Sequence, residues 1–278
     1  MQYSTVNGQR VLPFPKGKGV CDMCGAEALA KCGEKVMWHW AHKSKKDCDP
    51  WWENETEWHR NWKSKFPESF REVVFECSET GEKHRADIVT DKGMALEIQN
   101  SPICLEELRS REVFYKNLVW IVNGKKFKSG FNIWEAPLPD PQCPDFDDVV
   151  FMASQYKPSC SMFWRKSENP EALQNERAMV LIHGAEEIEN EINNNYIGHH
   201  SFHWVRPHIA WLEAKCPVLI DFGDEILWRI ENYKNQFLCV RAIAREKVIH
   251  DIKTEKVATD IASRFYPMTD MQTKGATT

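Results

Sequence analysis

The sequence predicts an α/β fold, and the order of its elements in the first half of the chain supports this prediction. Residues 71–77 have the composition of a strand, and residues 83–101 form two short strands around an Asp-Lys-Gly turn. A Ser-Pro pair then suits the start of a helix over residues 102–118. The apolar run 119–122 is typical of a strand that is covered on both faces. Strand, hairpin, helix and strand in this order indicate a sheet with helices packed on it.

The first fifty residues, 1–50, contain the pattern of a zinc knuckle. A Cys-x-x-Cys turn followed by Gly lets two thiolates converge on one tetrahedral ion. The cysteines cluster here with several histidines, and in a reducing compartment such a cluster favours zinc over disulfides. The preferred ligands are Cys21, Cys24, His42 and Cys48. His39 and Cys32 are the alternatives, and the residues before the first cysteine are expected to be irregular.

Residues 51–66 are expected to form a helix that ends before a proline. Glu55, His59 and Lys63 recur at intervals of four residues, so they would lie on one side of this helix. A solvated helix face would give the same spacing. The tryptophans among them favour an enclosed helix instead, with the three polar side chains directed toward a site.

The hairpin carries acidic groups where a strand would ordinarily bury apolar ones. Glu97 and Gln99 share one face of the second strand, while Leu96 and Ile98 take the other. The turn returns Glu97 toward Asp87, and two carboxylates brought together repel each other unless a cation lies between them. The hairpin therefore predicts a Mg²⁺ or Mn²⁺ site held by Asp87 and Glu97.

The helix after the hairpin places Arg111 and Tyr115 one turn apart. Two interpretations remain open for them. They could bind a substrate phosphate, or they could form a structural salt bridge and a packed ring.

An ordered set of motifs over residues 18–125 resembles the competence protein CoiA family, within the PD-(D/E)XK nuclease superfamily. The motifs are Cys21-x-x-Cys24, His39-Trp-Ala-His42, Glu55-Thr-Glu-Trp-His59 with Lys63, Arg85-Ala-Asp87, Glu97-Ile-Gln99-x-Ser101, Arg111, Tyr115 and Trp120-Ile-Val122. The resemblance implies a restriction-endonuclease-like core over residues 51–135.

The resemblance also implies roles for the polar residues ahead of the hairpin. Glu55 would join Asp87 and Glu97 at the metal or at a metal-bound water, and His59 and Lys63 would contact the scissile phosphate. Gln99 stands where many members of the superfamily carry Lys. An amide can orient water by hydrogen bonds but brings no positive charge, so Lys63, or failing that Lys116, would have to supply it.

The 278 residues can bury a sizeable core, and 42% apolar and 28% charged residues are ordinary for a globular protein. The net charge of −5 argues against a generally basic protein that wraps nucleic acid. No run approaches the roughly 18 apolar residues of a membrane span, and the first residues lack the order of a signal peptide. A cytoplasmic protein without membrane association is expected.

Residues 136–278 are expected to form a smaller α+β domain. Its predicted elements are a helix over 171–193, a hairpin over 217–230 around Gly-Asp, a strand over 237–243 and a helix over 245–264. This half shows no catalytic motif. It could bind substrate, a protein partner or a second copy of the chain.

Taken together, these features predict a nuclease with structural zinc and catalytic Mg²⁺ or Mn²⁺ that hydrolyses phosphodiester bonds, most readily in DNA during recombination, uptake or defence. One alternative is a non-catalytic accessory protein that binds DNA and retains the nuclease fold. Another is a phage-related effector whose C-terminal half senses a partner. The paired carboxylates favour the enzyme, because a protein that only binds DNA has no need to direct carboxylates toward a phosphate chain.

Overall fold

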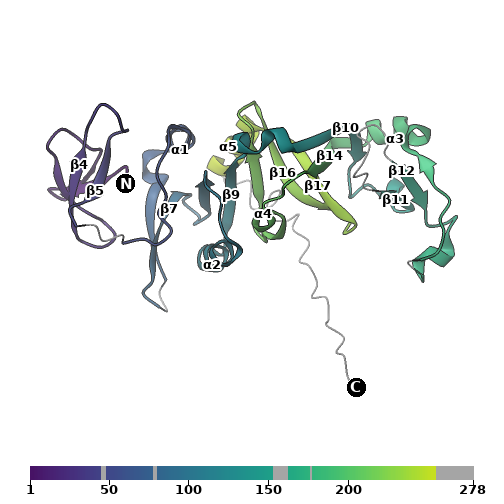
Figure 1. The fold of residues 1–278 in the computed structure, drawn as a ribbon, viewed down its shortest axis with the longest axis horizontal. Coiled ribbons are helices and arrows are strands. Elements are labelled where there is room, and N and C mark those ends of the chain that lie inside the picture. The colour runs from purple at the N-terminus through teal and green to yellow at the C-terminus, as the bar shows by residue number, and fades with distance from the viewer. Residues whose placement is uncertain (45–47, 78–79, 153–161, 176, 255–278) are drawn as a thin grey trace, which may run out of the picture.

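The computed structural model describes residues 1–44, 48–77, 80–152, 162–175 and 177–254. Three sheets follow one another along the long axis of the molecule (Figure 1), with five, nine and three strands. The middle sheet is the largest and carries most of the apolar core. It contains the predicted strand, hairpin, helix and strand, so the α/β prediction is confirmed.

The N-terminal sheet is antiparallel and has the order β2-β1-β3-β4-β5. Its strands are β1 (Ser4–Val6), β2 (Gln9–Val11), β3 (Lys18–Val20), β4 (Glu27–Lys31) and β5 (His39–His42). The expectation of an irregular segment before Cys21 is wrong, because three of these strands precede it. Buried Trp40 packs edge-on against Phe14 and donates a hydrogen bond to the carbonyl of Val11, which ties β5 to the first strands.

The nine-stranded sheet has the order β10-β14-β17-β16-β15-β9-β8-β7-β6. Its strands are β6 (Arg71–Glu76), β7 (Lys83–Val89), β8 (Ala95–Gln99), β9 (Leu118–Asn123), β10 (Phe131–Pro139), β14 (Tyr196–Trp204), β15 (Val218–Asp221), β16 (Ile226–Tyr233) and β17 (Phe237–Ala244). The helices beside it are α1 (Glu57–Lys63), α2 (Leu105–Tyr115), α4 (Ile209–Glu213) and α5 (Arg245–Thr254). Short 3-10 turns lie at Glu68–Phe70, Gly124–Lys126 and Lys128–Gly130.

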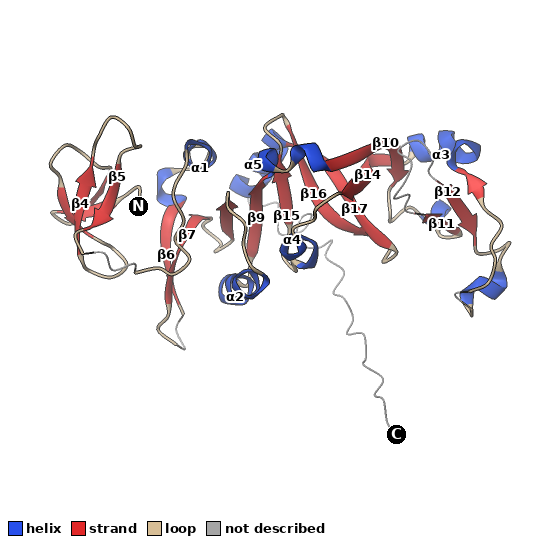
Figure 2. Cartoon of the chain, in the orientation of Figure 1, coloured by secondary structure: helices blue, strands red, loops and turns tan. Residues whose placement is uncertain are grey.

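The helices cover this sheet from both sides (Figure 2). Trp62 of α1 and Val248 of α5 belong to one apolar cluster, together with Leu96 and Ile98 of β8. Leu108 of α2 and Trp211 of α4 belong to the cluster on the other face. Strand β9 lies between parallel neighbours β8 and β15 and is buried from Leu118 to Val122, as its uninterrupted apolar sequence predicts.

The helices predicted over residues 51–66 and 102–118 are both shorter than expected. Helix α1 begins only after Thr56, whose hydroxyl accepts a hydrogen bond from the backbone N–H of His59 and caps the helix. Glu55 therefore precedes the helix and does not share a helical stripe with the later residues. Helix α2 begins after Cys104, and Ser101 does not cap it.

The sheet runs across the predicted boundary between residues 135 and 136, which falls inside β10. Strand β15 pairs in parallel with β9, so residues from both halves build one sheet. Asp221 at the end of β15 accepts hydrogen bonds from the indoles of Trp58 (2.9 Å) and Trp62 (2.8 Å). The C-terminal half thus helps to hold α1.

The predicted hairpin around Gly223-Asp224 is confirmed by antiparallel β15 and β16, and the strand predicted over 237–243 is confirmed by β17. The helix expected over 171–193 is wrong. That segment contains 3-10 turns at Pro170–Leu173 and Ala185–Ile188, β13 (His183–Gly184) and α3 (Glu189–Asn194).

Strand β13 completes the small third sheet with β11 (Val149–Met152) and β12 (Met162–Arg165), and a further 3-10 turn lies at Pro144–Phe146. The helix predicted over 245–264 is present as α5 up to Thr254, and its remainder lies outside the described residues. Among the described residues, no helix is both long and apolar enough to cross a membrane.

Candidate functional site

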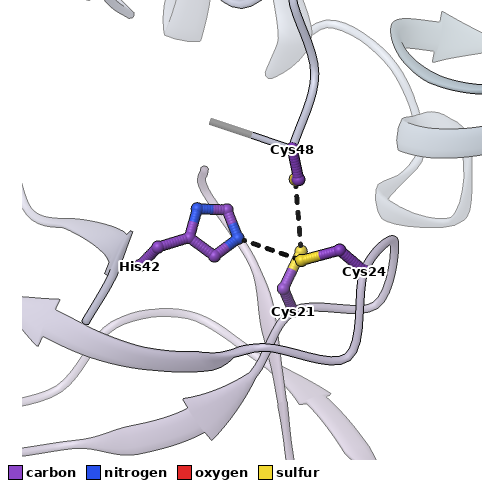
Figure 3. A group of neighbouring side chains, drawn as sticks. All are labelled: Cys21, Cys24, His42 and Cys48. Atoms are coloured by element: carbon purple, nitrogen blue, oxygen red, sulfur yellow. Dashed lines mark hydrogen bonds between the residues drawn. The ribbon is translucent and has the colours of Figure 1, made fainter. Parts of the chain in front are cut away.

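Four side chains of the N-terminal unit converge on one point (Figure 3). Cys21 and Cys24 come from the turn between β3 and β4, His42 ends β5, and Cys48 follows in the connection to the core. Their ligand atoms all lie within 4.8 Å of one another. The preferred set of sequence-predicted ligands is therefore the set that the fold assembles, while His39 turns its ring toward the carbonyl of Met37.

The spacing of these atoms fits a tetrahedral ion. Zn–S bonds of about 2.3 Å and Zn–N bonds of about 2.0 Å place tetrahedral ligand atoms roughly 3.5–3.8 Å apart. The Sγ atoms of Cys21 and Cys48 are 3.9 Å apart, and Cys24 Sγ lies 3.4 Å from His42 Nε2. These four residues could bind a metal such as zinc.

The ionisation of the thiols also suits a cation. Burial opposes ionisation of Cys21, but hydrogen bonds from the backbone of Cys24 and Met23 and from His42 outweigh it and lower the pKa of this thiol to about 6. Burial and the neighbouring Cys21 raise the pKa of Cys48 to about 12. One thiolate thus discourages the next, and a bound cation would relieve this repulsion.

A second site lies between the N-terminal unit and the edge of the nine-stranded sheet that β6–β8 form. It is a cavity of about 260 Å³. All eight residues predicted for catalysis and substrate binding line it: Glu55, His59, Lys63, Asp87, Glu97, Gln99, Arg111 and Tyr115. The structure therefore brings together residues that lie far apart in the sequence. His39, Trp40 and His42 of the N-terminal unit also line the cavity.

Three carboxylates on neighbouring strands, Glu72, Asp87 and Glu97, line this cavity. The β7–β8 register pairs Ile88 with Leu96, and continuing it places Asp87 opposite Glu97. Asp87 Oδ2 accepts a hydrogen bond from the backbone N–H of Ile98 (2.9 Å), which closes the hairpin at this point. On the other side of Asp87, the β6–β7 register places Glu72 opposite it. The predicted turn between the strands is confirmed.

Glu97 is buried and is held by Arg111, whose Nη1 lies 2.7 Å from Oε2. The second carboxylate oxygen, Oε1, is buried and has no hydrogen-bond partner among the described residues. Burial raises the pKa of Glu97 to about 8, against the lowering effect of Arg111, and the charge of Asp87 raises it further. Burial likewise raises the pKa of Asp87. Both carboxylates therefore lie where an added cation would be stabilising.

Lys63 provides positive charge in the cavity. Its Nζ lies 2.5 Å from Glu55 Oε1, 3.0 Å from Glu72 Oε1 and 3.6 Å from Asp87 Oδ1. Glu55 also pairs with Arg60 at 3.0 Å. Although Glu55 is not on the helix, it reaches Lys63 from the segment before it.

His59 is engaged on both ring nitrogens. The backbone N–H of Thr56 donates to Nδ1 (3.1 Å), so Nδ1 acts as an acceptor and Nε2 carries the proton. Nε2 lies 2.8 Å from Glu53 Oε1 and donates to it. Glu53 in turn accepts hydrogen bonds from the backbone N–H groups of Asn100 (3.1 Å) and Ser101 (3.2 Å). His59 thus orients Glu53 and ties α1 to the end of β8.

Gln99 and Tyr115 complete the wall beside Glu97. The amide of Gln99 donates to the carbonyl of Ser101 at 3.2 Å. Burial and the charge of Glu97 raise the pKa of Tyr115, so its hydroxyl keeps its proton. Arg111 also donates to the carbonyl of Trp51 (2.8 Å) and pairs with Glu107. The structural salt bridge that was one of the two interpretations of Arg111 is therefore present.

Sequence reasoning missed five further residues that line the cavity: Asp49, Trp51, Trp52, Glu53 and Glu72. Asp49 directly follows Cys48 and accepts hydrogen bonds from His84 Nδ1 and from the backbone of Arg85, both at 2.9 Å. It thereby joins the cysteine cluster to β7. The antiparallel register could have revealed Glu72, because it lies opposite Asp87. Glu53 gave no such signal.

Two family models match the chain. Competence protein CoiA, N-terminal domain, matches residues 15–50, and Competence protein CoiA, nuclease-like domain, matches residues 55–140. No curated protein and no solved structure matches the chain. The first matched range contains the cysteine cluster, and the second contains every predicted residue of the acidic cavity. Residues 15–140 are therefore similar to the CoiA family, with a cysteine- and histidine-bearing N-terminal domain followed by a nuclease-like domain.

Proposed function

We propose that this protein is a metal-dependent nuclease with a PD-(D/E)XK core, and that it hydrolyses phosphodiester bonds in DNA. The observation that carries the proposal is that buried Glu97 and partly exposed Asp87 line one cavity, each with a raised pKa. Such a pair is costly without a cation, and buried carboxylates with perturbed pKa values in a cavity are typical of functional sites. The match of residues 55–140 to a nuclease-like domain supports the same conclusion.

Asp87 and Glu97 are the residues that would hold Mg²⁺ or Mn²⁺. Oδ1 of Asp87 and the unpartnered Oε1 of Glu97 offer two carboxylate oxygens, and Mg²⁺ is commonly held by one or two carboxylates with waters and substrate phosphate. Such an ion supplies an activated water and stabilises the negative charge of the transition state. Among the described residues, three or more ligand groups within 4.8 Å occur only at the cysteine cluster, where we propose structural zinc.

The remaining cavity residues position these carboxylates and the substrate. Arg111 fixes Glu97 through its 2.7 Å contact. Gln99 can orient water or substrate by hydrogen bonds, and Lys63 brings a positive charge toward the phosphate. Glu55 assists by holding Lys63. His59 acts through Glu53 on the end of β8, and Tyr115 can donate its hydroxyl hydrogen to a phosphate oxygen.

A non-catalytic DNA-binding accessory protein is the competing function, and one observation favours it. Lys63 already pairs with Asp87 and Glu55, so an internal cation partly neutralises the acidic cavity. A fold that had lost turnover could keep such ion pairs for stability. The raised pKa values of Asp87 and Glu97, despite Lys63 and Arg111, favour the enzyme.

Cleavage of single- and double-stranded DNA with Mg²⁺ or Mn²⁺ tests the proposal. The natural protein should cleave, whereas Asp87→Ala and Glu97→Ala should abolish cleavage and leave zinc content and folding intact. Asp91→Ala is the matched control, because Asp91 lies in the exposed turn of the same hairpin. Full cleavage by the Asp87 and Glu97 variants would refute the site. DNA binding without cleavage by the natural protein would support the accessory function.

A further inference from the structure

We propose that Glu72 is a positioning residue that holds the Lys63 ammonium in the acidic cavity, so that Lys63 provides the positive charge that Gln99 cannot. This inference rests on the proposed nuclease function and extends it to a residue that the sequence motifs do not include. The geometry behind it is the position of Lys63 Nζ, 3.0 Å from Glu72 and 3.6 Å from Asp87.

Glu72 is placed by its backbone. The β6–β7 pairing passes from Arg71–Ile88 to Val73–Ala86 without a register shift, so Glu72 lies across from Asp87. Like charges at facing positions of two strands are destabilising. Glu72 also has a φ of 47°, a left-handed conformation that is unfavourable for a residue with a side chain. A strained residue with an unfavourable charge next to Asp87 indicates a role that offsets both costs.

Asp87 and Glu72 differ in the contacts that their carboxylate oxygens make. Asp87 uses Oδ2 for the backbone of Ile98, which leaves Oδ1, the oxygen that faces Lys63, as its less occupied oxygen for a metal ion. A metal ion at Oδ1 would therefore compete with Lys63 for Asp87. Glu72 has no such conflict: both its oxygens accept the backbone N–H of Gln2 at 2.9 Å, and Oε1 pairs with Lys63.

The electrostatics agree with a permanent pair. Burial opposes the charge on each partner, but Lys63 lowers the pKa of Glu72, and Glu72 raises the pKa of Lys63 before Asp87 and Glu55 add to it. Each charge therefore favours the ionised form of the other, in agreement with the 3.0 Å contact between them. When Asp87 binds a metal ion, Glu72 keeps the ammonium within the cavity, where it can face a phosphate oxygen.

The test is the affinity for Mn²⁺, measured by calorimetry on the full, zinc-loaded chain at pH 8. Lys63→Met removes the competing cation and should tighten Mn²⁺ binding at least tenfold. Glu72→Gln leaves Lys63 to Asp87 and Glu55 alone and should weaken Mn²⁺ binding at least tenfold. In the double variant Lys63→Met/Glu72→Gln, the Glu72 change should alter binding less than threefold, because no ammonium remains to be positioned.

Controls separate positioning from folding and from direct ligation. Glu76→Gln alters an exposed acid of the same strand and should leave Mn²⁺ binding unchanged. Glu72→Asp keeps the charge and should recover part of the loss. If Glu72→Gln fails to fold alone, the comparison of Lys63→Met with the double variant and the partial effect of Glu72→Asp still test the idea, because the double variant removes both members of the buried pair.

An equal weakening by Glu72→Gln with and without Lys63 would overturn the inference, since Glu72 would then be a metal ligand itself. Unchanged Mn²⁺ affinity in both single variants would overturn it as well. This test is separate from the test of the nuclease function. If the natural protein does not cleave DNA but the variants show the expected Mn²⁺ affinities, only the nuclease function is refuted. If the natural protein cleaves DNA but the variants do not show these affinities, only the role of Glu72 is refuted.

Discussion

The affinity of the acidic cavity for Mn²⁺ is expected to fall steeply as the pH is lowered from 9 to 6. Lowering the pH protonates Glu97, and this carboxyl group must lose its proton before both of its oxygens can bind a cation. Burial raises the pKa of this carboxyl to about 8 even though Arg111 opposes the shift and Asp87 adds to it. Around neutral pH, the metal-free protein therefore holds a proton where the metal ion should bind.

The size of the effect follows from competition between proton and metal. For a pKa of about 8, protonation weakens the apparent affinity about 10-fold at pH 7 and about 100-fold at pH 6, relative to pH 9. The same proton affects folding. The pKa of Glu97 rises from 4.5 to about 8 in the native state. The contribution of this proton to the stability of the metal-free protein should therefore be fully present below pH 4.5, and it should be lost as the pH rises to 8.

Calorimetric titration of Mn²⁺ into zinc-loaded protein tests this prediction. Titrations at pH 7 in two buffers with different ionisation enthalpies should show that about one proton is released for each ion bound. Glu97→Gln should bind Mn²⁺ more weakly and lose this proton release. An affinity that stays constant between pH 6 and pH 9, with no proton released, would refute the reasoning about burial.

Three further predictions concern structure and zinc. Asp221→Ala should lower the free energy of unfolding in urea by about 3–5 kcal/mol, because it removes the acceptor for two indole N–H groups of α1 and for the partly exposed Arg245. A loss below about 1 kcal/mol would contradict this expectation. Cys48→Ser should reduce the zinc content measured by mass spectrometry, whereas the Cys32→Ser protein should retain one equivalent of zinc. Equal zinc content in the two variants would exclude the four-ligand site. At pH 9, where Glu97 is ionised, Arg111→Met should cost about 3–5 kcal/mol by leaving the Glu97 carboxylate buried without its partner. Glu97→Gln in the same chain should restore much of this loss, and no recovery would show that packing dominates.

The nuclease-like half could be predicted from sequence because its signals are local. The apolar run of β9, the turn between β7 and β8 and the alternation at Leu96–Gln99 each follow from neighbouring residues. The candidate zinc ligands could be chosen for the same reason. In the structure His42 lies with the cysteines, because β5 continues to His42 and His39 turns its ring toward the carbonyl of Met37.

The parts that could not be predicted depend on residues distant in the chain. Helix α1 is short because Thr56 caps it, although the preceding residues have helical composition. The position of Glu72 depends on the register of two strands, and that of β15 on a partner in the other half of the chain. The segment over 171–193 contains many helix-forming glutamates, but three short elements and a small sheet replace the expected helix.

The parallel pairing of β9 with β15 has a consequence for synthesis on the ribosome. Strand β9 emerges with one hydrogen-bonding edge uncovered, and its sequence, Leu-Val-Trp-Ile-Val, is strongly apolar. Its partner at Val218–Asp221 follows only after β10 to α4 have been made, which takes about 5–20 s at ordinary rates of translation. During this interval the nascent nuclease-like half exposes an edge that readily pairs with other chains. Chaperone binding to nascent chains should therefore peak after residue 123 has emerged and decline once residue 221 has followed.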